Sequence, residues 1–193
     1  MSFLSLISLL CISVPCFAPK PSPLPQPDVK AAVISMYVEN KNELSIESSR
    51  IRRKRDLIQR VVKNHRGYAI RHGYDHYLLN STKNATIPIY WTKVLGWLEV
   101  MSSEAYQWIF YLDIDAVIIK SAISISAILE KFRIADHQHF IFAGDTLVIN
   151  SGVLLMRNVL WMKSLLRDSL RIGGRDFLPN FEQGVIAAQL GGW

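Results

Sequence analysis

Asp113 and Asp115 are the two residues whose type and spacing most directly suggest chemistry. They follow the apolar and aromatic run at residues 108–112, which has the length and composition of a buried strand. Because an unpaired carboxylate is costly to bury, we expect the pair to lie where that strand ends. Side chains two residues apart in extended chain point the same way, so both carboxylates can converge on one divalent cation.

The chemistry of such a pair depends on the enzyme class around it. Mg²⁺ and Mn²⁺ prefer carboxylate, water and phosphate oxygens. Asp-x-Asp after a hydrophobic strand occurs in nucleotide-sugar glycosyltransferases, where the metal bridges to a diphosphate. It also occurs in phosphatases of the haloacid dehalogenase type, in which Asp113 would be the nucleophile and Asp115 the general acid. A third interpretation is structural, with one aspartate capping a turn and the other on the surface.

Apolar periodicity predicts strands and helices in alternation along the chain. Besides residues 108–112, we expect strands at 31–38, 75–79, 140–143 and 147–156. We expect helices at 47–72, 87–101, 123–132, 159–171 and 184–190. This alternation favours a single α/β domain over residues 28–193, with a mostly parallel sheet flanked by helices.

The positive charge is concentrated in one segment. The net charge is +6, yet nine of the 22 basic residues fall between Arg50 and Arg71, where Asp56 is the only acid. We interpret this segment as a solvated helix face; attraction of an anionic membrane or substrate is the alternative. Because no nucleic-acid motif accompanies the basic run, we do not expect a nucleic-acid partner.

The N-terminal region has the pattern of a secretory leader. Residues 3–18 form an apolar run that is shorter than the ~20 residues of a membrane-spanning helix and resembles a signal peptide or a short signal anchor. Residues 19–27 are a Pro-rich spacer. Asn80 and Asn84 each begin an N-glycosylation sequon. We therefore expect a Golgi or ER lumenal protein, type II membrane-anchored through residues 3–18, or a secreted one.

Five segments in a fixed order carry a more specific resemblance. They are HRGYAIRHGYDHYL, YWTKVLGWLEVM, WIFYLDIDAVI, GDTLVINSGVLLMRN and FEQGVI. Together they resemble glycosyltransferase family 34, which includes fungal galactosyl- and mannosyltransferases and plant xyloglucan xylosyltransferases. The resemblance implies a GT-A type, Rossmann-like fold. It also implies transfer of a hexose or pentose, with retention, from a UDP- or GDP-sugar to an oligosaccharide or polysaccharide acceptor.

The resemblance assigns the metal and the donor diphosphate to three residues. Asp113 and Asp115 match the family's DxD, which holds Mn²⁺ or Mg²⁺, with Asp115 expected to touch the metal directly and Asp113 also to lie at the nucleotide sugar. Lys93 matches a basic residue that faces the donor diphosphate. Taken alone, a single lysine on a helix is usually solvated.

The same resemblance assigns the donor sugar to residues further along the chain. Asp145 and the tract Asn150, Ser151 and Gly152 match an Asp followed by an Asn-small-Gly turn at the sugar. Glu182 and Gln183 match an acid-Gln pair beside the transferring sugar. We therefore predict catalytic roles for Asp145, Glu182 and Gln183 and donor-binding roles for the Asn-Ser-Gly tract.

Two departures from the family pattern set an alternative. Leu147 and Val148 stand where the family usually has Asn-Gly, and no residue matches the family's C-terminal His, which completes the metal shell. We therefore expect a chain truncated at its C-terminus, and the alternative function is a catalytically incomplete fragment that binds nucleotide sugar. His137 and His139 do not lie where that ligand belongs, and we expect both in a solvated loop.

Overall fold

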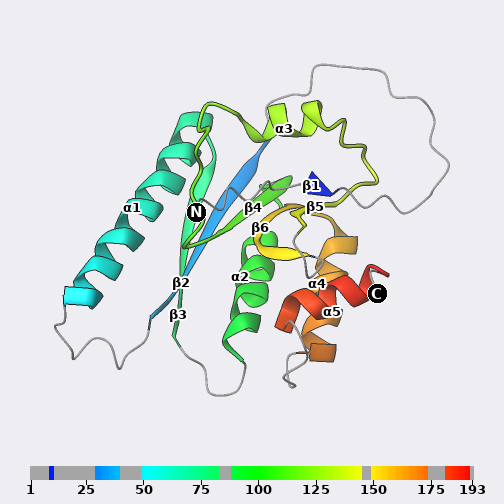
Figure 1. Ribbon diagram of the computed structural model, residues 1–193. Coiled ribbons are helices and arrows are strands. Elements are labelled where there is room, and N and C mark those ends of the chain that lie inside the picture. Colours follow the sequence, from blue (N-terminus) through cyan, green and yellow to red (C-terminus); the bar gives the residue numbers. More distant parts are fainter. Residues whose placement is uncertain are drawn as a thin grey trace, which may run out of the picture.

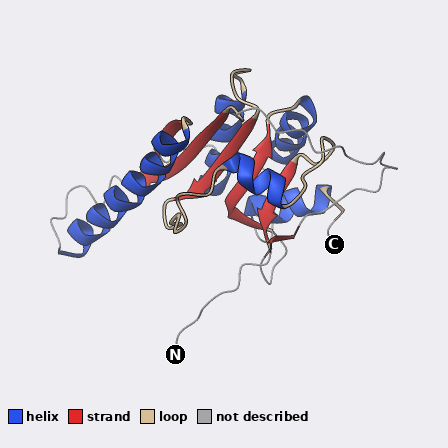
Figure 2. Ribbon diagram, turned by 90° about the horizontal axis from the view of Figure 1, so that it is seen from above, coloured by secondary structure: helices blue, strands red, loops and turns tan. Residues whose placement is uncertain are grey.

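The computed structural model describes residues 9–10, 29–39, 49–82, 88–144, 149–173 and 181–191. Helices lie on both sides of one twisted sheet (Figures 1 and 2). The elements follow in the order β1 (Leu9–Leu10), β2 (Ala31–Glu39), α1 (Ser49–His72), β3 (Asp75–Thr82), η2 (Ile89–Trp91), α2 (Thr92–Met101), β4 (Trp108–Asp113), α3 (Ile125–Lys131), β5 (Phe140–Ala143), β6 (Asn150–Arg157), α4 (Leu160–Gly173) and α5 (Phe181–Gln189).

The sheet is mixed, which corrects the expectation that it is mostly parallel. Its strand order is β1-β5-β6-β4-β2-β3. Only β2 with β3 and β2 with β4 pair parallel, whereas β4 with β6, β5 with β6 and β1 with β5 pair antiparallel. Parallel neighbours need a crossover of a dozen or more residues, and residues 144–149 between β5 and β6 are too few for one.

Each face of the sheet packs against its own helices because strand side chains alternate. On β2, Ala32 and Ile34 point into the largest cluster, which α2, α4 and α5 cover. Val33 points to the opposite face, where it meets Tyr68 and Ala69 of α1. The strand at 31–38 and the helix at 47–72 are therefore confirmed, with ends shifted by one or two residues.

Three predicted boundaries are wrong, and each lies at a polar tract. Strand β3 continues to Thr82, so Asn80 is in the strand and does not follow it. Helix α5 begins at Phe181, so Glu182 and Gln183 lie in its first turn and do not precede it. Strand β6 begins at Asn150, so the Asn-Ser-Gly tract starts the strand and does not interrupt it. Apolar periodicity does not locate these boundaries, because the tracts consist of polar residues and glycine.

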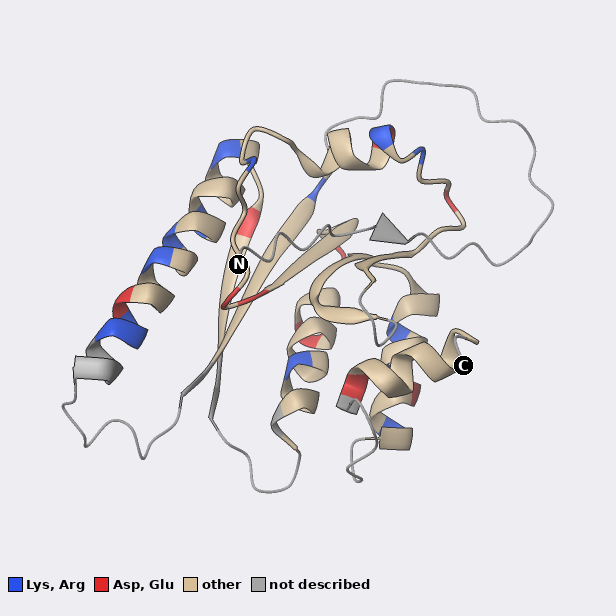
Figure 3. Cartoon of the chain, in the orientation of Figure 1, with Lys and Arg blue, Asp and Glu red and all other residues tan. Residues whose placement is uncertain are grey.

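The basic segment lies on α1. Lys and Arg recur along this helix (Figure 3). Its described basic residues are all exposed: Arg53, Lys54, Arg55, Arg60, Lys63, Arg66 and Arg71. The predicted solvated helix face is thus confirmed. Within the described ranges no helix is long and apolar enough to cross a membrane, and of the leader at 3–18 only residues 9–10 are described.

Candidate active site

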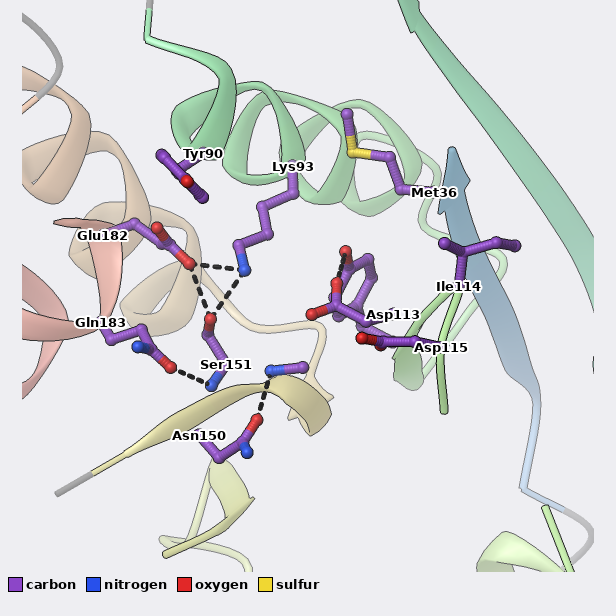
Figure 4. Close-up of a pocket in the computed structure, with 12 residues that line it drawn as sticks. Met36, Tyr90, Lys93, Asp113, Ile114, Asp115, Asn150, Ser151, Glu182 and Gln183 are labelled. Carbon is purple, nitrogen blue, oxygen red and sulfur yellow. Dashed lines mark hydrogen bonds and ion pairs between the residues drawn. The ribbon is translucent and has the colours of Figure 1, made fainter. Parts of the chain in front are cut away.

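A pocket of about 550 Å³ opens where β4 ends, between the sheet and the helices α2 and α5 (Figure 4). Asp113 is the last residue of β4, as the sequence predicts. The pocket is lined by Met36, Tyr90, Lys93, Tyr111, Asp113, Ile114, Asp115, Asn150, Ser151, Gly152, Glu182 and Gln183. Every predicted metal, donor and catalytic residue is therefore in one pocket except Asp145, which lies outside the described residues.

Asp113 and Asp115 form what we call the acidic wall of the pocket. Their carboxylates lie on the same side of the chain, turned towards the cavity (Figure 4). Asp113 is half-buried and Asp115 exposed. The Tyr111 hydroxyl donates to Asp113 Oδ1 at 2.5 Å. Burial and the negative charge of Asp113 raise the pKa of Tyr111 far above its usual range, so its proton stays in place as a donor.

Gly152 lies against the acidic wall and has no side chain for a steric reason. A Cβ built there would lie 2.8 Å from Asp113 Oδ2 and 2.9 Å from Asn150 Oδ1. These distances are shorter than ordinary van der Waals contacts, so any side chain would displace the carboxylate. Gly within a strand often marks such a close approach. The glycine therefore sets where the Asp113 carboxylate can lie.

Lys93, Ser151 and Glu182 form the opposite, paired wall. The Lys93 ammonium lies 2.5 Å from Glu182 Oε1 and donates to Ser151 Oγ at 2.7 Å. The Ser151 hydroxyl donates to Glu182 Oε1 at 2.6 Å. The side chains of Lys93 and Glu182 are only 11% and 2% exposed. Lys93 is thus buried and ion-paired, which contradicts the expectation that a single helix lysine is solvated.

The start of β6 is fixed by side-chain amides. Gln183 Oε1 accepts a hydrogen bond from the Ser151 backbone N–H at 2.9 Å, and Asn150 Oδ1 accepts one from the Gly152 N–H at 2.8 Å. The first bond joins α5 to β6 across the pocket floor. One carboxylate oxygen beside it, Glu182 Oε2, is buried and has no hydrogen-bond partner among the described residues. Because it is fully buried, that oxygen is closed to a ligand in this arrangement.

The charge of the lining determines which ligands the pocket can hold. Three carboxylates and one ammonium give a formal charge of −2. This charge repels a nucleoside diphosphate unless a cation lies between them. In the described part of the chain no group of three or more His, Cys, Asp or Glu side chains could hold a metal. Two carboxylates still suit Mg²⁺ or Mn²⁺, because such sites take their remaining ligands from water and substrate phosphates.

Comparison with protein families identifies the chain. The sequence model of the galactosyl transferase GMA12/MNN10 family matches residues 30–134, more than half of the protein. The chain belongs to this family. The matched part of this glycosyltransferase includes Lys93 and the acidic wall, whereas Asn150 and Glu182 lie beyond it. No sequence among curated proteins matches the chain.

Solved structures with a similar fold are glycosyltransferases. A glycosyltransferase involved in the glycosylation of the major capsid of PBCV-1 aligns with a TM-score of 0.57 at 14% identity, over 81% of this chain and 73% of its own. The Streptococcus pneumoniae glycosyltransferase GlyE gives 0.46 at 13%, over 84% of this chain and 43% of its own. A Drosophila β1,4-galactosyltransferase 7 mutant complexed with manganese, UDP-Gal and xylobiose gives 0.46 at 13%, over 84% and 63%.

Family and fold together make the chain a GT-A type glycosyltransferase and decide against the phosphatase interpretation of the Asp pair. The family implies a nucleotide-sugar donor and a glycan acceptor. Sequence reasoning missed Tyr111, although its place two residues before Asp113 puts both on one face of β4. It also missed Tyr90 and Met36, which no local pattern connects with the pocket.

The remaining candidates among the described residues do not line the pocket. Asn80 is on the edge strand β3, where its backbone pairs with Tyr37 of β2, and Asn84 lies outside the described residues. His139 packs its ring against Trp161, with centroids 5.5 Å apart, just before β5 begins. Burial lowers the pKa of His139, as does the positive charge of Arg157. This histidine is thus partly packed, where sequence reasoning expects a solvated loop.

Proposed function

We propose that this glycosyltransferase transfers a hexose or pentose from a UDP- or GDP-sugar to an oligosaccharide or polysaccharide, retaining the anomeric configuration. The donor diphosphate would bind through Mn²⁺ or Mg²⁺ at the acidic wall. The observation that carries the proposal is the pairing of Asp113 and Asp115 at the end of β4, in a pocket with a formal charge of −2. A divalent cation compensates that charge in full.

The two walls would act on the leaving diphosphate in different ways. Asp113 and Asp115 would hold a metal that supplies positive charge to the departing diphosphate. Tyr111, by holding one oxygen of Asp113 at 2.5 Å, would aim the other towards the cavity. Lys93 would supply a second positive charge. In the free protein Glu182 neutralises that charge through the 2.5 Å pair, so the ammonium is already positioned before the donor arrives.

The donor sugar would lie over the start of β6 and the first turn of α5. Glu182 lines the pocket at this point and would border the sugar. Gln183 fixes the backbone at Ser151 and would border the same sugar. We include Asp145 here because of the family resemblance alone. Retention requires attack from the face of the leaving group, and we name no nucleophile.

The Asp115→Asn variant tests this assignment. It removes one carboxylate charge while keeping the shape of an exposed side chain. We expect Mn²⁺-dependent nucleotide affinity to fall by about 100-fold or more. Losing a residue that only supports a metal ligand can lower metal affinity by up to about 100-fold, and losing the ligand itself should cost at least as much. Asp168→Asn, at an exposed position on α4, is the matched control and should leave affinity unchanged. Equal Mn²⁺ and nucleotide affinity in Asp115→Asn and wild type would refute the assignment.

We also propose a Golgi or ER lumenal location, with membrane anchoring through residues 3–18. The apolar leader and the sequons at Asn80 and Asn84 support this proposal. Asn80 lies near the end of the edge strand β3. The enzyme that attaches N-glycans can reach such a position more easily than one on a central strand. Expressed in eukaryotic cells, the chain should lose mass on treatment with an N-glycosidase, and Asn80→Gln with Asn84→Gln should abolish that loss. An unglycosylated product would contradict this location.

A further inference from the structure

One face of α1 holds the chain directly after the Asp pair. Asn64 makes two hydrogen bonds to the backbone of Ile118, from Nδ2 to the carbonyl at 3.0 Å and from the Ile118 N–H to Oδ1 at 2.9 Å. His65 Nε2 lies 2.9 Å from the Ala116 carbonyl oxygen. His72 Nε2 lies 2.8 Å from that of Ser121. Figure 1 shows this segment running beside α1 towards α3.

The hydrogen bonds of His65 belong to a chain whose direction can be assigned. The Ala116 carbonyl only accepts, so His65 Nε2 carries the proton. In the neutral ring Nδ1 then accepts from the Ser35 hydroxyl, 2.7 Å away. The Ser35 oxygen in turn accepts from His76 Nε2 at 3.0 Å. Ser35 and His65 are both fully buried, and burial lowers the pKa of His65, which favours this neutral form.

This chain connects three elements to the residue that follows Asp115. Ser35 is on β2, His65 on α1 and His76 on β3. Ala116 also donates its N–H to the Asp113 carbonyl at 3.0 Å, which closes a turn over the Asp pair. Apolar contacts reinforce the turn, because Ala116 packs against the cluster of α1 and β2. The backbone is therefore fixed on both sides of Asp115.

We propose that His65 positions Asp115 for metal binding, acting through the Ala116 carbonyl. The inference rests on the proposed function, because it assumes that the acidic wall binds a divalent cation. Among the described residues no hydrogen bond holds the Asp115 carboxylate, whereas Asp113 has Tyr111. Asp115 is also exposed, so its direction depends on the backbone that carries it. Among the described residues, His65 supplies the side-chain hydrogen bond nearest to that backbone.

The test compares two substitutions of His65 in the full-length chain. His65→Leu keeps an apolar volume but removes the bond to Ala116, and we expect Mn²⁺ affinity, measured by calorimetry with UDP or GDP present, to fall about tenfold. His65→Gln can place an amide N–H near the position of Nε2 and should bind within about threefold of wild type. If His65 served only for packing, His65→Gln would not restore Mn²⁺ affinity.

A second pair of variants separates positioning from loss of stability. Val61→Ala removes a buried side chain from the same helix; it should lower the melting temperature in metal-free buffer while Mn²⁺ affinity stays as in wild type. Ser35→Ala removes the hydroxyl that orients the His65 ring and should weaken Mn²⁺ binding by a smaller factor than His65→Leu. Wild-type affinity in His65→Leu, or an equal loss in Val61→Ala, would overturn the proposal.

Amide hydrogen exchange in the metal-free protein tests the role of His65 separately from metal binding. The Ala116 and Ile118 amides are hydrogen-bonded in the free protein, so without metal they should exchange slowly in wild type and faster in His65→Leu. A folded wild-type chain that binds no Mn²⁺ with either nucleotide would refute the proposed function and the positioning role with it. If wild type binds Mn²⁺ but amide exchange is equal in both chains, only the inference about His65 fails.

Discussion

The two walls of the pocket differ in how their charges are satisfied. On the paired wall, Lys93 and Ser151 both contact Glu182 Oε1 and each other, at distances of 2.5 to 2.7 Å. On the acidic wall, Asp113 receives one hydrogen bond from Tyr111, and the exposed Asp115 is held through its backbone. The paired wall is therefore part of the folded core, whereas the acidic wall retains charge that an external ligand must compensate.

This difference teaches which charges the fold already compensates in the free protein and which await a ligand. Removing one partner of a buried ion pair leaves an uncompensated charge, which is strongly destabilising. Removing an exposed carboxylate costs little stability, and relieving repulsion between neighbouring carboxylates can even add some. The walls should thus respond to substitution in opposite ways, one in stability and the other in ligand binding.

The largest expected effect on stability is at the paired wall. Lys93→Met keeps most of the stem but leaves the Glu182 carboxylate, 2% exposed, without its cation. We expect the free energy of unfolding to fall by about 3–5 kcal/mol, measured by urea unfolding without metal. Combining Lys93→Met with Glu182→Leu should recover most of the loss. If Lys93→Met alone were as stable as wild type, the paired wall would not stabilise the fold and the two walls would not differ in stability.

A smaller effect is expected where the walls meet, at Gly152. In Gly152→Ala the new Cβ would be 2.8 Å from Asp113 Oδ2, and the carboxylate must move. We expect Mn²⁺ affinity to fall about tenfold, with a stability loss near 1 kcal/mol, the low end for overpacking. Gly67→Ala on α1 is the matched control, because its Cβ would meet no atom within 4 Å. It should raise stability by about 0.5–1 kcal/mol and leave Mn²⁺ binding unchanged.

The smallest effect concerns pH and the histidines behind the acidic wall. Burial lowers the pKa of His65 below its ordinary 6.5, and burial together with the charges of His65 and Arg66 lowers that of His76. The unfolded chain therefore binds more protons, so stability is complete above pH 6.5 and declines as pH falls below it. Melting temperatures from pH 7.5 to 5.5 should fall less steeply for His65→Gln. Equal slopes of melting temperature against pH in wild type and His65→Gln would show that His65 does not cause this pH dependence.

Much of the fold could be predicted because its elements carry a regular apolar pattern. Strand β2 and helix α1 begin and end within two residues of their predicted bounds. Strand direction could not be predicted from periodicity, because side chains alternate in the same way in parallel and antiparallel strands. The first turn of α5 was missed because Glu182 and Gln183 are polar, and they are polar because they face the pocket.

The candidate site could be predicted in part for a similar reason. Asp113 and Asp115 are neighbours in sequence, so spacing alone brings them together. The bond from Lys93 to Ser151 joins residues 58 apart, and the contact of His65 with Ala116 joins residues 51 apart. No local spacing encodes such contacts, and they depend on how α1 and α2 dock on the sheet. Family resemblance indicated Lys93, but only the structure reveals its ion pair with Glu182.

The central claim is that the acidic wall binds a nucleotide through a divalent cation. The most direct measurement is calorimetric titration of the full-length chain with UDP and with GDP, each in Mn²⁺ and in EDTA. We expect one nucleotide to bind in Mn²⁺ and to lose that binding in EDTA, because the lining charge of −2 repels the free diphosphate. Equal binding in EDTA, or no binding by a chain shown to be folded, would contradict the claim.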